Sequence, residues 1–127
     1  MFVVAVAYVK TIAQFKDRLV KEFEDWIESI VLYGSVAKNK THRNSDIDIL
    51  LVTRDNDKRL YDKISKIRTK IDLENNTLTS LVHMSSEELE RYIKLGSPFV
   101  KSVAEEGVIL YDSGIFKKFR ESLVIKG

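Results

Sequence analysis

The chain has 127 residues, of which 44% are hydrophobic and 31% charged, and its formal net charge is +2. This length fits one domain with a single apolar core, and so small a net charge does not indicate wholesale wrapping of nucleic acid. Because the sequence contains no cysteine, disulfides and thiolate metal sites are excluded, which suits a reducing interior.

The first predicted element is an amphipathic helix. The apolar start at residues 1–9 is too short for a membrane span of about 18 residues and lacks the flanks of a signal peptide, so we expect a cytoplasmic protein without membrane contact. Apolar residues then recur at helical spacing over residues 11–27, which predicts a helix that packs on a sheet. The stripe consists of Ile12, Phe15, Leu19, Val20, Phe23 and Trp26.

Two strands are predicted next. Residues 29–33 form an apolar run rich in β-formers, and residues 46–52 form a second such run. The polar, basic loop between them can hold a helical turn at residues 35–38. Further on, apolar periodicity predicts a helix over residues 55–72 and a strand over 77–84, and capping signals predict two short helices. These span residues 85–96 and 97–107, followed by a strand at 108–112 and a basic helix or tail at 113–127.

This order predicts an α/β fold of the mixed type. Two consecutive strands joined by a long loop and followed by a helical crossover favour a mixed sheet covered by helices over a doubly wound parallel sheet. No repeat, low-complexity tract or proline-rich linker divides the chain. We therefore expect a single small domain over residues 1–127.

Two aspartates stand at the start of the second strand. Side chains alternate along a strand, so Asp46 and Asp48 share one face with Leu50, with α-carbons roughly 6.6 Å apart. Aspartate is rare in strands and like charges repel, which favours a divalent cation between them. The alternative is a solvent-exposed edge strand that carries both aspartates for solubility. The spacing alone does not decide between the two.

A Gly34-Ser35 turn directly follows the preceding strand. Glycine lets the backbone approach a ligand closely, and Ser35 can cap a helical turn. Backbone N–H groups and the serine hydroxyl then form an anion cradle suited to phosphates. A tight turn without a ligand is the alternative for Gly-Ser alone. A phosphate cradle and a carboxylate pair on adjacent strands together favour a nucleoside triphosphate with a bridging metal.

These residues resemble a known signature. Gly34-Ser35, ten further residues that end in Ser45, and then Asp46-Ile47-Asp48 before an aliphatic run are similar to the motif of minimal nucleotidyltransferases in the DNA polymerase β superfamily. The resemblance continues through "LVHMSSEELE" and "GSPFVKSVAEEGVILYD" and covers most of residues 29–112. It implies a nucleotidyltransferase-type mixed sheet covered by helices.

The resemblance also implies an activity and its residues. The expected reaction moves a nucleoside monophosphate from an NTP, with ATP as the expected donor, to a hydroxyl of a protein, an RNA or a small molecule. Asp46 and Asp48 are implied as the catalytic residues and as ligands of Mg²⁺ or Mn²⁺, in the two-metal arrangement for in-line displacement. The residues implied in nucleotide binding are Gly34, Ser35, Lys38 and Ser45.

Two departures from the family pattern limit this inference. The family often has Ala-Arg-Gly where this chain has Ala37-Lys38-Asn39, so Lys38 keeps a cation without the bidentate fork of arginine. Active members also place a third carboxylate on the next strand, whereas residues 77–84 contain none. The general base is therefore unassigned. The nearby acids are expected to be exposed helix-end charges: Asp72, Glu74, Glu87 and Glu88.

The two histidines and the basic loop have simpler alternatives. His83 could bind a metal near the site, but we expect a hydrogen-bonded structural histidine. The loop "KNKTHR", which contains Lys40, His42 and Arg43, could attract a nucleotide or an RNA backbone, or it could be a solvated basic loop.

Two functions remain open at this point. One is an active nucleotidyltransferase. The other is a catalytically weak or inactive nucleotide-binding subunit that docks on a separate helical partner, because minimal nucleotidyltransferases resemble the antitoxin companions of HEPN-type toxins. A glycosyltransferase or a haloacid-dehalogenase-like phosphatase fits less well, since both expect a much larger chain.

Overall fold

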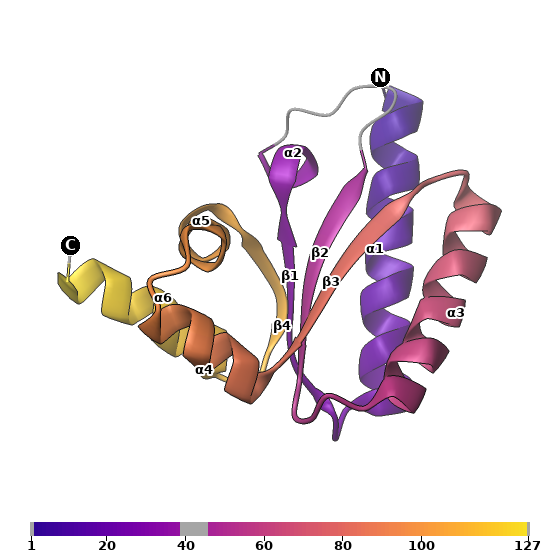
Figure 1. The fold of residues 1–127 in the computed structure, drawn as a ribbon. Coiled ribbons are helices and arrows are strands. Elements are labelled where there is room, and N and C mark those ends of the chain that lie inside the picture. Colours follow the sequence, from indigo (N-terminus) through magenta and orange to yellow (C-terminus); the bar gives the residue numbers. More distant parts are fainter. Residues whose placement is uncertain (1, 39–45, 127) are drawn as a thin grey trace.

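The computed structural model describes residues 2–38 and 46–126, with the backbone alone for 2–5 and 124–126. In this part of the chain, helices cover both faces of a four-stranded sheet (Figure 1). The elements in chain order are α1 (Phe2–Phe23), β1 (Ile27–Tyr33), α2 (Gly34–Ala37), β2 (Ile47–Thr53), α3 (Lys58–Asn75), β3 (Thr79–Ser85), α4 (Ser86–Lys94), α5 (Pro98–Glu106), β4 (Val108–Asp112) and α6 (Ile115–Lys126).

The sheet is mixed, as the sequence predicts. The strand order is β3-β2-β1-β4. β1 pairs antiparallel with both β2 and β4, whereas β2 and β3 are parallel. A parallel pair needs a crossover connection, and α3 supplies it between β2 and β3. The turn α2 directly follows β1 and lies at the end of the sheet where β2 begins (Figure 1).

Two helical layers bury the two faces of the sheet. On one face, Ile47, Ile49 and Leu51 pack in a core with residues of α1 and α3. On the other face, Leu50 and Val52 pack with residues of α4, α5 and α6. Figure 1 shows α1 and α3 on one side of the sheet and α4, α5 and α6 on the other. Because both faces are covered, β2 is a nearly continuous apolar run in which a charged residue stands out.

Helix α1 differs from the prediction at both ends. It starts at Phe2, so the apolar start is helical although valine favours strands. Tyr8 in this extension is buried in the core with residues of α3 and the sheet, and this burial outweighs the weak propensity term. The placement of Trp26 on the helical stripe was wrong. The helix ends at Phe23, and Trp26 lies in the turn into β1 with 40% of its surface exposed.

Side-chain caps begin α3, α4 and α5, and those of α4 and α5 are the ones that the sequence predicts. Asp57 accepts hydrogen bonds from the backbone of Arg59 and Leu60 at the start of α3. Ser85 and Glu88 form a complete capping box at α4. Ser97 caps α5, in which Pro98 is the first residue. In the described residues, no helix combines the length and apolar character that a bilayer crossing requires.

Candidate active site

Asp48 lies beside the end of β1. It is the second residue of β2, and its cross-strand partner is Tyr33, the last residue of β1. Asp46 directly precedes the strand and is exposed. By strand alternation, Asp48 shares its face with Leu50 and Val52, the face that α4, α5 and α6 cover.

Gly34 fits closely against the Asp48 side chain. Its φ is +77°, and a β-carbon built on it would overlap Oδ2 of Asp48. Glycine is needed here for two reasons, since other residues rarely adopt this φ and none leaves room for the carboxylate. The turn α2 begins at the same residue, and the Lys38 N–H donates to the Gly34 carbonyl at 3.2 Å. The structure thus brings the Gly-Ser turn and the strand aspartate into direct contact.

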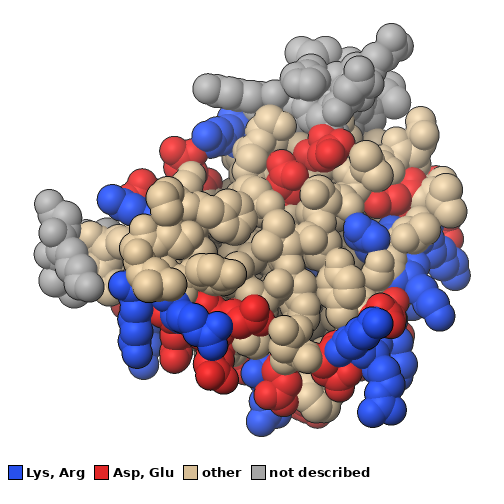
Figure 2. Space-filling view, in the orientation of Figure 1, with Lys and Arg blue, Asp and Glu red and all other residues tan. Residues whose placement is uncertain are grey.

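The charges around Asp48 favour the binding of a cation. Burial raises the pKa of Asp48, and the negative charge of Asp46 raises it further. Burial also raises the pKa of the Tyr33 hydroxyl, with a smaller contribution from Asp48. In each case ionisation is penalised by desolvation and by a nearby anion. Figure 2 shows acidic atoms near the end of the sheet where α2 lies, while the centre of that face is largely uncharged.

Lys38 is paired with a residue of α5. Its Nζ lies 2.6 Å from Oε2 of Glu106, and the two side chains are 45% and 50% exposed. An ion pair with this exposure contributes between about 0 and 1 kcal/mol. The Lys38 ammonium group, just after α2, is therefore held toward α5 by a weak contact.

Ser45, which the sequence assigns to nucleotide binding, lies outside the described residues, as do His42 and the rest of the loop 39–45. Within the described ranges, no group of three or more His, Asp or Glu residues is arranged to hold a metal ion. On β3, the residue opposite Asp48 is Ser80, and the residue opposite Leu50 is Val82. The position next to Asp48 thus carries a hydroxyl, on the strand where the family pattern leads us to expect a carboxylate.

The expectation that Asp72 is an exposed helix-end charge was wrong. Asp72 is only 8% exposed and accepts hydrogen bonds from the Thr77 hydroxyl and from both the N–H and the hydroxyl of Thr79, each at 2.8 Å. The left-handed Asn76 turns the chain back after α3, which brings these donors over the carboxylate. Asp72 therefore joins α3 to β3, and both of its carboxylate oxygens are occupied by these hydrogen bonds.

The other acids near β3 are Glu74 in the last turn of α3 and Glu87 and Glu88 in the first turn of α4. Glu87 and Glu74 are exposed, as expected. The expectation that Glu88 is exposed was wrong: it is partly buried, because its Oε1 accepts the Ser85 N–H at 3.0 Å in the capping box.

His83 is a structural histidine, as expected. Its Nε2 is hydrogen-bonded to the Thr53 hydroxyl at 2.7 Å, and its ring stacks on Tyr61 of α3 with a centroid separation of 5.2 Å. Burial lowers the pKa of His83, with Glu88 opposing the shift. These contacts place the imidazole on the α3 side of the sheet, which is the face opposite Asp48.

Sequence reasoning missed the aromatic surroundings of the aspartates. The Tyr33 ring meets the Phe99 ring edge to face, with centroids 5.3 Å apart. Phe99 also lines a cavity of about 310 Å³ between β3, α4 and α5. No local signal identifies this contact, because the two rings are 66 residues apart in the chain and meet only when α5 packs on the sheet.

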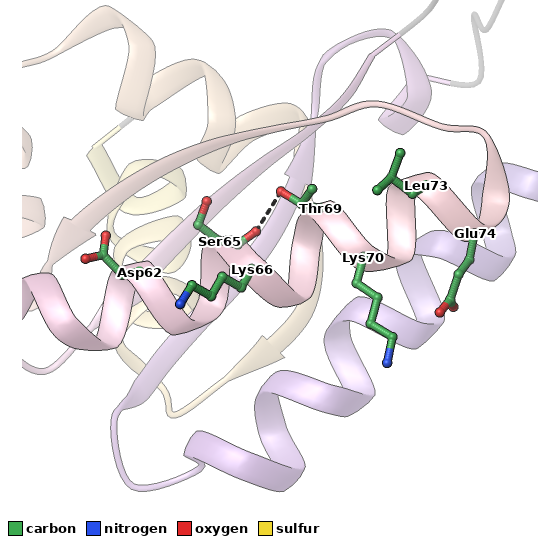
Figure 3. Close-up of a pocket in the computed structure, with 7 residues that line it drawn as sticks. All are labelled: Asp62, Ser65, Lys66, Thr69, Lys70, Leu73 and Glu74. Atoms are coloured by element: carbon green, nitrogen blue, oxygen red, sulfur yellow. Dashed lines mark hydrogen bonds between the residues drawn. The ribbon is translucent and has the colours of Figure 1, made fainter.

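A larger hollow of about 640 Å³ lies on the outer side of α3. Figure 3 shows that all its lining residues come from this one helix: Asp62, Ser65, Lys66, Thr69, Lys70, Leu73 and Glu74. The Thr69 hydroxyl is occupied by a 3.0 Å hydrogen bond to the Ser65 carbonyl. Because α3 covers the face of the sheet opposite Asp48, this solvated helix face is separate from Asp46 and Asp48.

Comparisons with known proteins identify the family and the fold of the chain. The model of the family described as "Nucleotidyltransferase domain" matches residues 12–111. Two proteins of Methanocaldococcus jannaschii are similar: "Putative protein adenylyltransferase MJ0604" is 34% identical over 80% of this chain and 96% of its own length, and "Putative protein adenylyltransferase MJ0126" is 30% identical over 80% and 98%. A chain from a crystal structure of a toxin–antitoxin with AMP-PNP shares the fold, with a TM-score of 0.59, 20% identity, and coverage of 88% of this chain and 83% of that one.

Proposed function

Since the chain belongs to the nucleotidyltransferase domain family, which implies an NTP substrate, we propose that it transfers AMP from ATP to a hydroxyl group of a protein. The observation that carries the proposal is the contact of Gly34 with the Asp48 carboxylate, which sets the Gly34-Ser35 turn against the acidic start of β2. The choice of AMP and of a protein acceptor is supported by the two relatives described as protein adenylyltransferases. Hydroxyls of RNA or of a small molecule are the other acceptor classes.

The donor set fits a hard divalent cation. Two carboxylates approach each other at the start of β2, and their repulsion together with burial raises the pKa of Asp48. A cation between Asp46 and Asp48 would offset both penalties, and carboxylate oxygens are the ligands that Mg²⁺ and Mn²⁺ prefer. Such a metal, when bound, supplies charge neutralisation at the phosphates and lowers the pKa of the acceptor hydroxyl.

The turn α2 is proposed to hold the β- and γ-phosphates. The first N–H groups of a helical turn have no acceptor within the turn, and Tyr33 makes no side-chain cap there. In the proposed complex, these groups and the Ser35 hydroxyl donate to phosphate oxygens, and Lys38 exchanges its weak pair with Glu106 for the triphosphate. Ser45 is proposed to complete the nucleotide site.

The proposed step is an in-line displacement at the α-phosphorus. The acceptor oxygen forms the new P–O bond, the bond between the α-phosphorus and the bridging oxygen breaks, and pyrophosphate leaves. Residue Ser80, opposite Asp48 on β3, cannot act as a carboxylate base. The hydroxyl proton is therefore proposed to pass to water, which predicts slow transfer. The chain contributes positioning and charge neutralisation.

Titration calorimetry tests the donor site. ATP, GTP, CTP and UTP are each titrated into the protein, once in the presence of Mg²⁺ and once in the presence of EDTA. The wild type is compared with the double variant Asp46→Asn/Asp48→Asn, whose fold is checked by circular dichroism. We expect Mg²⁺-dependent binding of ATP that the double variant loses. Binding that persists in the double variant, or in EDTA, would refute the assignment of the aspartates.

A docking subunit with little chemistry is the second candidate. The absence of a carboxylate opposite Asp48 favours it, and a HEPN-type helical protein is the proposed partner. The test is co-purification of that partner with the wild type and with Asp46→Asn, combined with transfer of label from [α-³²P]ATP. Docking without chemistry predicts a complex that survives Asp46→Asn and no label on the partner with either chain.

A further inference from the structure

A cavity of about 310 Å³ lies between β3, α4 and α5, at the edge of the sheet, and its lining includes Val82, which lies on the same face of the sheet as Asp48, and His83 of the opposite face. Its walls combine two aromatic rings with the side chains of one strand: Tyr92 of α4, Phe99 of α5, and Val82 and Met84 of β3. Tyr92 and Phe99 remain 42% and 38% exposed. Large aromatic side chains that stay exposed around a hollow are typical of a ligand-binding surface rather than of a core.

The sheet register gives the distance from the aspartates to this cavity. Asp48 is opposite Ser80, and Val82 follows two residues later on the same face of β3. One strand spacing and two residue rises separate Asp48 from Val82, which amounts to about 8 Å between α-carbons. On the other side, Phe99 contacts Tyr33, and Tyr33 is the strand partner of Asp48. A nucleotide with its phosphates at Asp48 thus has a cavity within reach of its base.

The chemistry of the cavity selects the uncharged part of a nucleotide. Glu88 lines it, and one carboxylate oxygen of Glu88 is tied to the Ser85 N–H in the capping box. A carboxylate in the wall disfavours phosphate, whereas the flat faces of exposed aromatic rings favour a nucleobase. A volume near 300 Å³ is also at the lower end of the range of small-molecule pockets.

From this arrangement we propose that the cavity between β3, α4 and α5 is the base site of the nucleotide, and that the purine ring of ATP packs against Tyr92 and Phe99. The inference rests on the proposed nucleotidyl transfer, because the phosphates must lie at Asp46 and Asp48. It adds a specific subsite: α4 and α5 hold the base, while the end of β1 and the start of β2 hold the triphosphate.

The test separates base binding from phosphate binding. Dissociation constants are measured in Mg²⁺ for ATP and for inorganic tripolyphosphate, which has the phosphates but no base. The variants are Tyr92→Ala and Phe99→Leu, which remove one flat ring each, with Tyr92→Phe retaining a ring. Leu95→Ala is the matched control, because Leu95 is 74% exposed just beyond α4 and does not line the cavity.

The expected result is a selective loss. Tyr92→Ala and Phe99→Leu should weaken ATP binding by about five- to a hundredfold, the range for stacking of one base on one aromatic ring. Tripolyphosphate binding should change less than about twofold, and Tyr92→Phe and Leu95→Ala should bind ATP like the wild type.

Three outcomes overturn the base site in different ways. If both ring variants bind ATP like the wild type, the cavity serves another occupant, such as an apolar side chain of the acceptor. If they lose ATP and tripolyphosphate equally, the rings act on the phosphate site or on folding. If the wild type binds neither ligand, the proposed function fails first and the base site fails with it.

Discussion

Gly34→Ala should weaken nucleotide binding at the site in addition to destabilising the fold. The added β-carbon would overlap Oδ2 of Asp48, so the carboxylate or the turn must move. The φ of +77° adds a backbone cost of about 1–2 kcal/mol for any L-residue. Displacing Asp48 would cost one charge-assisted contact of about 1.5–3 kcal/mol, which is roughly ten- to a hundredfold in the affinity for Mg²⁺·ATP.

Gly96→Ala provides the matched control for that prediction. Gly96 has a φ of +70°, close to that of Gly34, but a β-carbon built on it meets nothing within 4 Å. Both variants should therefore lose a similar 1–2 kcal/mol or so in the free energy of urea unfolding, while only Gly34→Ala should lose Mg²⁺·ATP binding in calorimetry. Equal loss of binding in the two variants would show that backbone strain, and not the contact with Asp48, controls the site.

Three further predictions concern charges around the site. The pKa of Asp48 is raised above its ordinary 3.8, so ionising this side chain lowers the stability of the folded chain above the raised pKa. Asp48→Asn should therefore stabilise the chain against urea at pH 7 and give no gain below pH 3.8. The same variant should abolish Mg²⁺·ATP binding. Lys38→Ala should weaken ATP binding and Glu106→Gln should tighten it severalfold, with stability changes below about 1 kcal/mol in both, because the surface pair is weak. Asp72→Asn should cost about 1–3 kcal/mol in unfolding free energy, since its NH₂ group would face the Thr79 donors, with ATP affinity unchanged.

Local patterns predict most of the fold. The strands around Val31 and Leu50 are apolar runs with glycine or polar breaks, and the helices after Asp57, Ser85 and Ser97 start with side chains that cap them. The errors arise where tertiary contacts decide. The start of α1 is helical, and Tyr8 in it packs in the core with residues of α3 and the sheet. The burial of Asp72 depends on a left-handed turn at Asn76 that no periodicity reveals.

The candidate site is only partly predictable from the sequence. Gly34 and Asp48 can be selected as residue types, but their contact depends on the antiparallel register that pairs Tyr33 with Asp48. A strand pair joined by a long loop does not reveal that register, because loop length constrains pairing weakly. The cavity beside Phe99 is less predictable still, since it requires α4 and α5 to pack together over β3.

The residue opposite Asp48 offers a way to test why transfer should be slow. Ser80 is exposed and is the register partner of Asp48 on the parallel strand β3. Ser80→Asp would put a third carboxylate at this position, where it would repel Asp48 without a metal and share a cation with it when one is bound. We expect Ser80→Asp to lower stability in EDTA and to reduce the Mg²⁺ concentration required for half-maximal ATP binding by about tenfold, roughly 1.4 kcal/mol. Ser80→Asn, which adds similar volume without charge, should do neither. If the two variants behave alike, the metal does not lie between β2 and β3, and the third ligand must come from the acceptor or a partner protein.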